Sequence, residues 1–247
     1  MLAFVALIPA NGGAQAQDKK PATATMTPDA GTGTGTGTGV TAPTKEKQAA
    51  VTPQSALAEL KAGNARFVSG HLLKRDLRED VKATASGQYP LAVVLSCLDS
   101  RKPIEIILDQ GVGDIFSARI AGSVVNADIL GSMEFACKVS GAKLVAVLGH
   151  TSCGAIKGAI DDVKLGNLTE LLDKVKPAIA RVPADVQPRD SKNAAFVDKV
   201  TEANVRLAME QIRERSPVLR AMIDQNEVGL VGGMYDLSTG EVRFFDK

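Results

Sequence analysis

The middle of the chain alternates between apolar runs and segments of helical pattern. Three runs have the character of parallel strands covered on both faces: residues 91–95, 114–119 and 143–148. Helical patterns lie between and after them: residues 103–109, residues 127–139 and a helix that opens near Cys153. Strands and helices that follow one another in this order predict an α/β fold. We expect a parallel sheet flanked by helices and connected by right-handed crossovers.

Helical patterns also lie on either side of this region. Thr52 is a capping residue and Pro53 takes the first helical position, which together predict a helix over residues 53–69. Residues 168–224 have a helical pattern with three interruptions: Pro177, residues 183–188 and Ser216-Pro217. The chain then predicts a closing antiparallel hairpin from two strands separated by a turn: residues 228–235 and 241–245.

The first fifty residues do not have the composition of a folded domain. Residues 1–16 combine a short apolar run with Ala14-Gln-Ala16, a pattern typical of a signal peptide and its cleavage site, although no Lys or Arg precedes the run. Residues 17–50 are rich in Thr, Gly and Pro and predict a disordered linker. The folded domain is therefore expected over residues 51–247. These features predict a periplasmic or secreted protein, with a cytoplasmic protein as the alternative.

Charge and aromatic content restrict the classes of ligand. The chain has 29 Lys and Arg against 28 Asp and Glu, so no strong field attracts nucleic acid or an anionic membrane. It has no Trp and only two Tyr, which leaves few platforms on which bases or sugars could stack. No apolar run reaches the roughly 18–20 residues that a membrane-spanning helix needs. A small-molecule substrate fits this composition better than a polymer.

Three potential metal ligands follow the predicted strands. Cys97 comes after the first strand, and His150 and Cys153 come after the third, so all three belong to the carboxyl edge of the sheet, where ligands bind in open parallel sheets. Two thiolates and one imidazole form the ligand set of catalytic zinc sites, in which the fourth position stays open. The remaining cysteine, Cys137, is placed on a buried helix face and is expected to belong to the core.

Two alternatives to a catalytic zinc site remain open. Cys97 and Cys153 could be buried apolar residues or a disulfide, with His150 a hydrogen-bonded histidine at the end of a strand. The protein could also be a noncatalytic zinc or redox module in which Cys97 and Cys153 form an exchangeable disulfide. Next to Cys97, Asp99 and Arg101 are two positions apart, so that in an extended segment both point to one side and form an ion pair beside the metal. An ordinary surface salt bridge is the alternative for this pair.

The motif Cys97-x-Asp99-x-Arg101, followed about fifty residues later by His150-x-x-Cys153, resembles the signature of the β-class carbonic anhydrases. The resemblance extends from about residue 53 to residue 247. It implies a parallel α/β sheet with one C-terminal antiparallel strand or hairpin, a zinc ion, and a homodimer or dimer of dimers. The absence of Trp indicates that the inhibitory bicarbonate site of one branch of the family is not present in its known form.

The resemblance also implies an activity and residue roles. The reaction is the reversible hydration of CO₂ to bicarbonate and a proton by zinc-bound hydroxide. Asp99 accepts the proton of the hydroxide in a hydrogen bond, Arg101 holds Asp99 away from zinc, and a released Asp99 becomes a fourth zinc ligand. Gly154 is expected to offer its backbone N–H to bicarbonate. The alternative substrates on the same fold are carbon disulfide and carbonyl sulfide.

Overall fold

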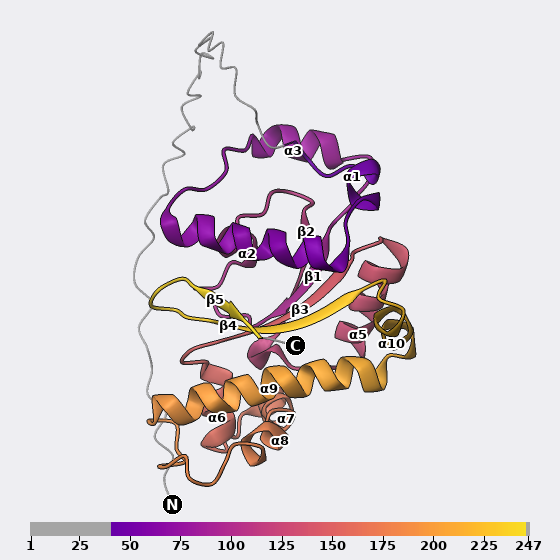
Figure 1. The fold of residues 1–247 in the computed structure, drawn as a ribbon. Coiled ribbons are helices and arrows are strands. Elements are labelled where there is room, and N and C mark those ends of the chain that lie inside the picture. The colour runs from indigo at the N-terminus through magenta and orange to yellow at the C-terminus, as the bar shows by residue number, and fades with distance from the viewer. Residues whose placement is uncertain (1–40, 246–247) are drawn as a thin grey trace, which may run out of the picture. The chain divides into compact units, whose positions relative to one another are not determined.

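The computed structural model describes residues 41–245 (Figure 1). The predicted signal peptide over residues 1–16, and the predicted linker as far as residue 40, lie outside the described residues. The described chain contains a five-stranded sheet with the order β2-β1-β3-β4-β5. Its strands are β1 (Ala92–Ser96), β2 (Ile115–Arg119), β3 (Leu144–His150), β4 (Gly229–Tyr235) and β5 (Val242–Phe244). The first four are parallel and β5 is antiparallel to β4, as the sequence predicted.

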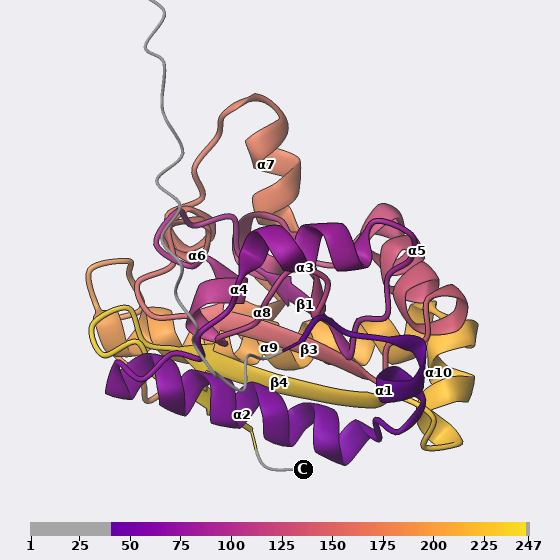
Figure 2. The same cartoon turned by 90° about the horizontal axis from the view of Figure 1, so that it is seen from above.

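Helices cover both faces of the sheet (Figures 1 and 2). On one face lie α2 (Pro53–Ser69) and α4 (Ile104–Ile107), and on the other lie α5 (Ala127–Glu134), α9 (Ala194–Arg215) and α10 (Pro217–Asp224). Successive residues of a strand point to opposite faces. In β1, Val94 therefore packs with α2 and α4, whereas Val93 packs with the α9 side. This double cover explains why β1 and β3 are continuous apolar runs.

The bounds of α2 agree with the helix predicted over residues 53–69. At its start the Thr52 side chain accepts a hydrogen bond from the Ser55 backbone, and the Ser55 hydroxyl accepts one from the Thr52 backbone. At its end Gly70 adopts a left-handed conformation with a φ of 73°. Glycine takes this conformation without steric cost, so the helix stops there.

A third group of helices lies beyond the carboxyl edge of the sheet. It contains α6 (Gly154–Ile160), α7 (Gly166–Asp173) and α8 (Lys176–Ala180), which pack against the first half of α9. Cys97 and Cys153 belong to the apolar cluster that these helices form. Cys97 and Cys153 are thus covered by an apolar layer and removed from water.

The structure differs from the sequence expectations at three helices. A short helix, α1 (Lys45–Ala49), lies inside the segment predicted as linker, and its Gln48 amide donates to the carbonyls of Pro90 and Ser140 at 2.8 Å each. The packed part of the chain therefore begins before residue 51. Helix α3 (Leu77–Thr84), capped by the Asp76 carboxylate, was not predicted. The helix predicted over residues 127–139 is α-helical over α5 and continues as a π-helical segment, η2, from Phe135 to Val139.

The sequence predicted no membrane-spanning run, and the structure tests this for the described residues. Across residues 41–245, no helix combines the length and the apolar composition that a membrane crossing needs.

Candidate metal centre

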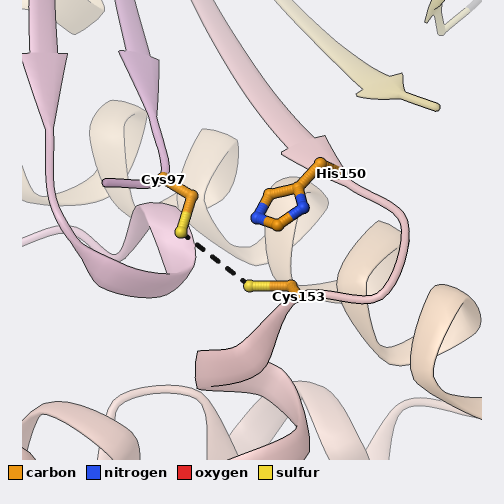
Figure 3. Close-up of side chains that lie close together, drawn as sticks. All are labelled: Cys97, His150 and Cys153. Carbon is orange, nitrogen blue, oxygen red and sulfur yellow. Dashed lines mark hydrogen bonds between the residues drawn. The ribbon is translucent and has the colours of Figure 1, made fainter. Parts of the chain in front are cut away.

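The three predicted ligands converge at the carboxyl edge of the sheet (Figure 3). Cys97 follows the last residue of β1, His150 is the last residue of β3, and Cys153 directly precedes α6. Their ligand atoms all lie within 4.8 Å of one another. The residues are 5%, 0% and 1% exposed, respectively, so the cluster is shielded from bulk water. The sequence prediction that these residues meet agrees with this geometry.

The ligand side chains meet beyond the end of β1, where the neighbouring strand β3 continues for two more residues. The ladder between β1 and β3 ends at the pair Ser96 and Leu148, whereas β3 continues for two residues along β4 and ends with His150 opposite Tyr235. The chain then turns through Ser152, which has a left-handed φ of 55°. This turn reverses the direction of the chain after β3 and brings Cys153 close to His150.

The distances fit one tetrahedral zinc ion. Two sulfurs bound to tetrahedral zinc at about 2.3 Å lie about 3.8 Å apart, and the sulfurs of Cys97 and Cys153 are 3.9 Å apart. The Nδ1 atom of His150 lies 2.9 Å from the carbonyl oxygen of Thr151, so Nδ1 carries the proton and donates it. The lone pair is then on Nε2, which is buried and has no hydrogen-bond partner among the described residues. A buried, unpaired nitrogen that faces two sulfurs is explained by a metal ligand role.

The protonation of the two thiols is linked. The Cys153 thiol donates to Cys97, which lowers the pKa of the Cys97 thiol, and backbone amides lower it further against the effect of burial. The pKa of the Cys153 thiol rises, because it holds the shared proton and is buried. Amides of Ala155 and Ile156, in the first turn of α6, also point at the Cys153 sulfur. A divalent cation would displace the shared proton, since bound thiols are deprotonated.

Asp99 and Arg101 form the predicted ion pair, but in a different backbone conformation. Arg101 Nε donates to Asp99 Oδ1 at 3.0 Å and Nη2 donates to Oδ2 at 2.8 Å. The segment is a turn and not extended, because Asp99 Oδ1 also accepts the Arg101 backbone N–H at 3.0 Å. These bonds hold the pKa of the Asp99 carboxyl below its ordinary range. Asp99 Oδ2 lies 4.0 Å from His150 Nε2, which places an ionised carboxylate beside the candidate metal position.

One positioning residue was not predicted. Arg119, the last residue of β2, donates from Nε to the Cys97 carbonyl at 3.3 Å and from Nη2 to the Asp99 carbonyl at 2.6 Å. The available signal was its place at the end of a strand on the same edge of the sheet as Cys97. Arg119 thus supports the turn that carries Cys97 and Asp99 from the neighbouring strand.

The structure also places Gly154 and Cys137, which the sequence singled out, and the second histidine of the chain, His71. Gly154 is the first residue of α6 and is exposed. His71 is exposed and follows the left-handed Gly70 at the end of α2. Cys137 is 2% exposed and packs in the core on the α9 side of the sheet, where burial raises the pKa of its thiol to about 12. Cys137 is therefore a core residue, as predicted.

Comparison with known proteins agrees with the sequence motif. A sequence profile described as carbonic anhydrase matches residues 92–242. A β-carbonic anhydrase of the fungal pathogen Aspergillus fumigatus has a similar structure, with a TM-score of 0.62 at 28% identity over 78% of this chain and 90% of that chain. The chain belongs to the β-carbonic anhydrase family. It is accordingly an enzyme of the zinc-dependent carbonate dehydratases, which are lyases.

Two curated relatives of this β-carbonic anhydrase cover most of its packed region. Carbonic anhydrase 2 of Mycobacterium tuberculosis is 36% identical over 195 residues, which are 78% of this chain and 93% of that protein. A carbonic anhydrase of Mycolicibacterium smegmatis is 35% identical over 192 residues, which are 77% and 92% of the two chains. The matched lengths show that the similarity extends over nearly the whole of these relatives.

Proposed function

We propose that the protein hydrates CO₂ reversibly to bicarbonate and a proton, with zinc held by Cys97, His150 and Cys153. The observation that supports this most strongly is the buried, unpaired Nε2 of His150, which faces two sulfurs at the spacing of tetrahedral zinc ligands. Three protein ligands leave the fourth position for a substrate molecule. When bound, zinc lowers the pKa of a water molecule and supplies hydroxide near neutral pH.

The residues around the centre would orient the reacting water. The Asp99 carboxylate stays ionised beside Arg101, so it would accept a hydrogen bond from the reacting water and orient a lone pair of its oxygen toward CO₂. Arg101 holds both carboxylate oxygens, which keeps Asp99 from taking the fourth ligand position. Gly154, at the start of α6, would donate its backbone N–H to the bicarbonate oxygen.

Assembly and location are part of the same proposal. We infer a homodimer or a dimer of dimers from the family resemblance and from exposed apolar side chains near α3: Leu72, Leu77 and Val81. Such side chains together mark surfaces that partners cover. We further propose export to the periplasm or beyond, on the strength of the apolar run and the Ala14-Gln-Ala16 motif within residues 1–16.

The test is zinc content measured together with CO₂ hydration on the same purified protein. We expect one zinc per chain, and stopped-flow activity that a chelator removes and added zinc restores. Carbonyl sulfide and carbon disulfide in the same assay examine the alternative substrates, and thiol titration examines the redox alternative. Protein that lacks zinc, or that holds zinc and does not hydrate CO₂, would contradict the proposal.

A further inference from the structure

The side chain of Lys102 is fully buried next to the metal centre. It is 0% exposed, and its ammonium donates to the carbonyls of Leu148 at 2.7 Å and of Gly149 at 3.0 Å. Burial lowers the pKa of this ammonium to about 7, although the thiolate charges of Cys97 and Cys153 favour the protonated form. Lysine is almost never buried completely unless it is paired, because desolvating its charge is costly. The two carbonyl bonds are what compensate for this burial.

Lys102 connects the two segments that supply the metal ligands. Its backbone N–H donates to the Asp99 carbonyl at 3.1 Å, within the turn that follows β1 and Cys97. Its side chain reaches the two residues of β3 that directly precede His150. Lys102 therefore bonds to the turn after Cys97 through its backbone, and to the end of β3 beside His150 through its side chain.

Lys102 connects the two segments beyond the last backbone pair between β1 and β3. The ladder between β1 and β3 ends at Ser96 and Leu148, so beyond this pair the ladder no longer fixes the distance between the two segments. Ser123 also donates to the Leu148 carbonyl, at 3.1 Å, but it comes from the segment after β2 and does not reach the Cys97 turn. Within residues 41–245, Lys102 is the side chain that bonds the Cys97 turn to the end of β3.

We propose that Lys102 is a positioning residue of the metal centre, which fixes Cys97 relative to His150 by tying the Leu148 and Gly149 carbonyls to the turn after β1. The inference rests on the proposed zinc site. Groups that hold metal ligands in place from behind typically change metal affinity about 10–100-fold when they are removed. The same range is expected for Lys102.

The first experiment is Lys102→Met in the full-length protein, with Lys61→Met, an exposed lysine on α2, as the matched control. Methionine keeps an unbranched side chain of similar volume but cannot donate to the carbonyls. Competition with a chelator should show zinc bound about 10–100-fold more weakly than in the unsubstituted protein. The visible spectrum of the cobalt-substituted protein should also change, because it reports ligand geometry. Lys61→Met should match the unsubstituted protein in both measurements.

A second measurement on the unsubstituted protein does not depend on the folding of a variant. Coupling between two sites is reciprocal, so zinc should also hold Lys102 in place. Reductive methylation followed by peptide mass spectrometry should modify Lys102 at least about 10-fold faster after zinc is removed, while Lys61 reacts at one rate. Equal Lys102 rates with and without zinc, or a folded Lys102→Met protein with unchanged zinc affinity and cobalt spectrum, would overturn the inference. If the unsubstituted protein binds no zinc, the proposed function itself fails.

Discussion

Arg101→Ala separates the role of the ion pair from that of the metal ligands. Asp99 Oδ2 lies 4.0 Å from His150 Nε2. Two atoms that ligate one tetrahedral zinc at about 2.1 Å lie about 3.4 Å apart. A movement that shortens this distance by about 0.6 Å would therefore let Asp99 occupy the fourth position. The two bonds from Arg101, of 3.0 and 2.8 Å, are the contacts that oppose it.

The pKa of the Asp99 carboxyl decides whether Asp99 can act as the fourth zinc ligand in Arg101→Ala. Without Arg101 the carboxyl pKa rises from its lowered value toward the ordinary value of about 3.9. Asp99 then remains ionised at neutral pH and is still an anionic ligand. We expect CO₂ hydration to fall by about 10²-fold or more while zinc stays bound, since the water would lose both its place and its orientation.

The assay is stopped-flow CO₂ hydration between about pH 6 and 9, with zinc measured on the same samples. In the unsubstituted protein the rate should rise with pH through one titration, because Asp99 does not titrate in this range. Asp99→Asn should lose about 10²-fold. Adding Arg101→Ala to Asp99→Asn should cause little further loss, because the amide cannot close the site as an anion. Arg213→Ala, which removes an exposed pair with Asp224, is the control.

Near-normal turnover of Arg101→Ala would refute this reasoning. So would a structure of that variant near neutral pH in which Asp99 stays away from the metal. Either result would leave Arg101 as a structural residue, and the pair would then be no more than the salt bridge that its exposed arginine suggests.

Three further predictions concern the metal, the packing behind it and the start of the mature chain. His150→Ala or Cys153→Ala should abolish zinc binding and activity together, and a variant with one zinc per chain and full rate would refute the ligand assignment. Gly149→Ala would place a Cβ 2.7 Å from Thr201 Cγ2, so the free energy of unfolding should fall by about 1–3 kcal/mol in denaturant titrations and zinc affinity should weaken. The mature chain should begin near Gln17 outside the cytoplasm; mass spectrometry that finds an intact Met1 in the cytosolic fraction would disprove this.

The sequence predicted the sheet and the meeting of Cys97, His150 and Cys153 because both depend on short local patterns. The apolar runs that form β1 and β3 end within one or two residues of Cys97 and His150. Parallel strands deliver their carboxyl ends to one edge, so the positions of the ligands followed from the positions of the strands. The prediction of an ion pair between Asp99 and Arg101 was confirmed, although the bonds depend on a turn that the spacing alone does not specify.

The elements that were missed depend on contacts distant in sequence. Lys102 lies in the polar segment after Cys97, where a lysine is ordinarily exposed, and only the depth of the turn buries it. Helix α1 is short and lies in a segment of linker composition, and its Gln48 finds partners 42 and 92 residues away. Helix α3 had local signals, the capping carboxylate of Asp76 and the apolar Leu77 and Val81 four positions apart, but both apolar side chains are exposed and show no core contact to anchor a prediction.

With a metal bound, both cysteines of the centre would be thiolates. A site with two cysteines carries two negative charges that a site of three histidines lacks, and these cancel the charge of the metal. The protein places cations nearby without bonding them to sulfur. Arg101 binds the Asp99 carboxylate and Lys102 binds main-chain carbonyls, yet the charge of Cys153 favours the protonated form of both. Electrostatic interaction is reciprocal, so these cations favour the Cys153 thiolate and hence the metal-binding form of the site.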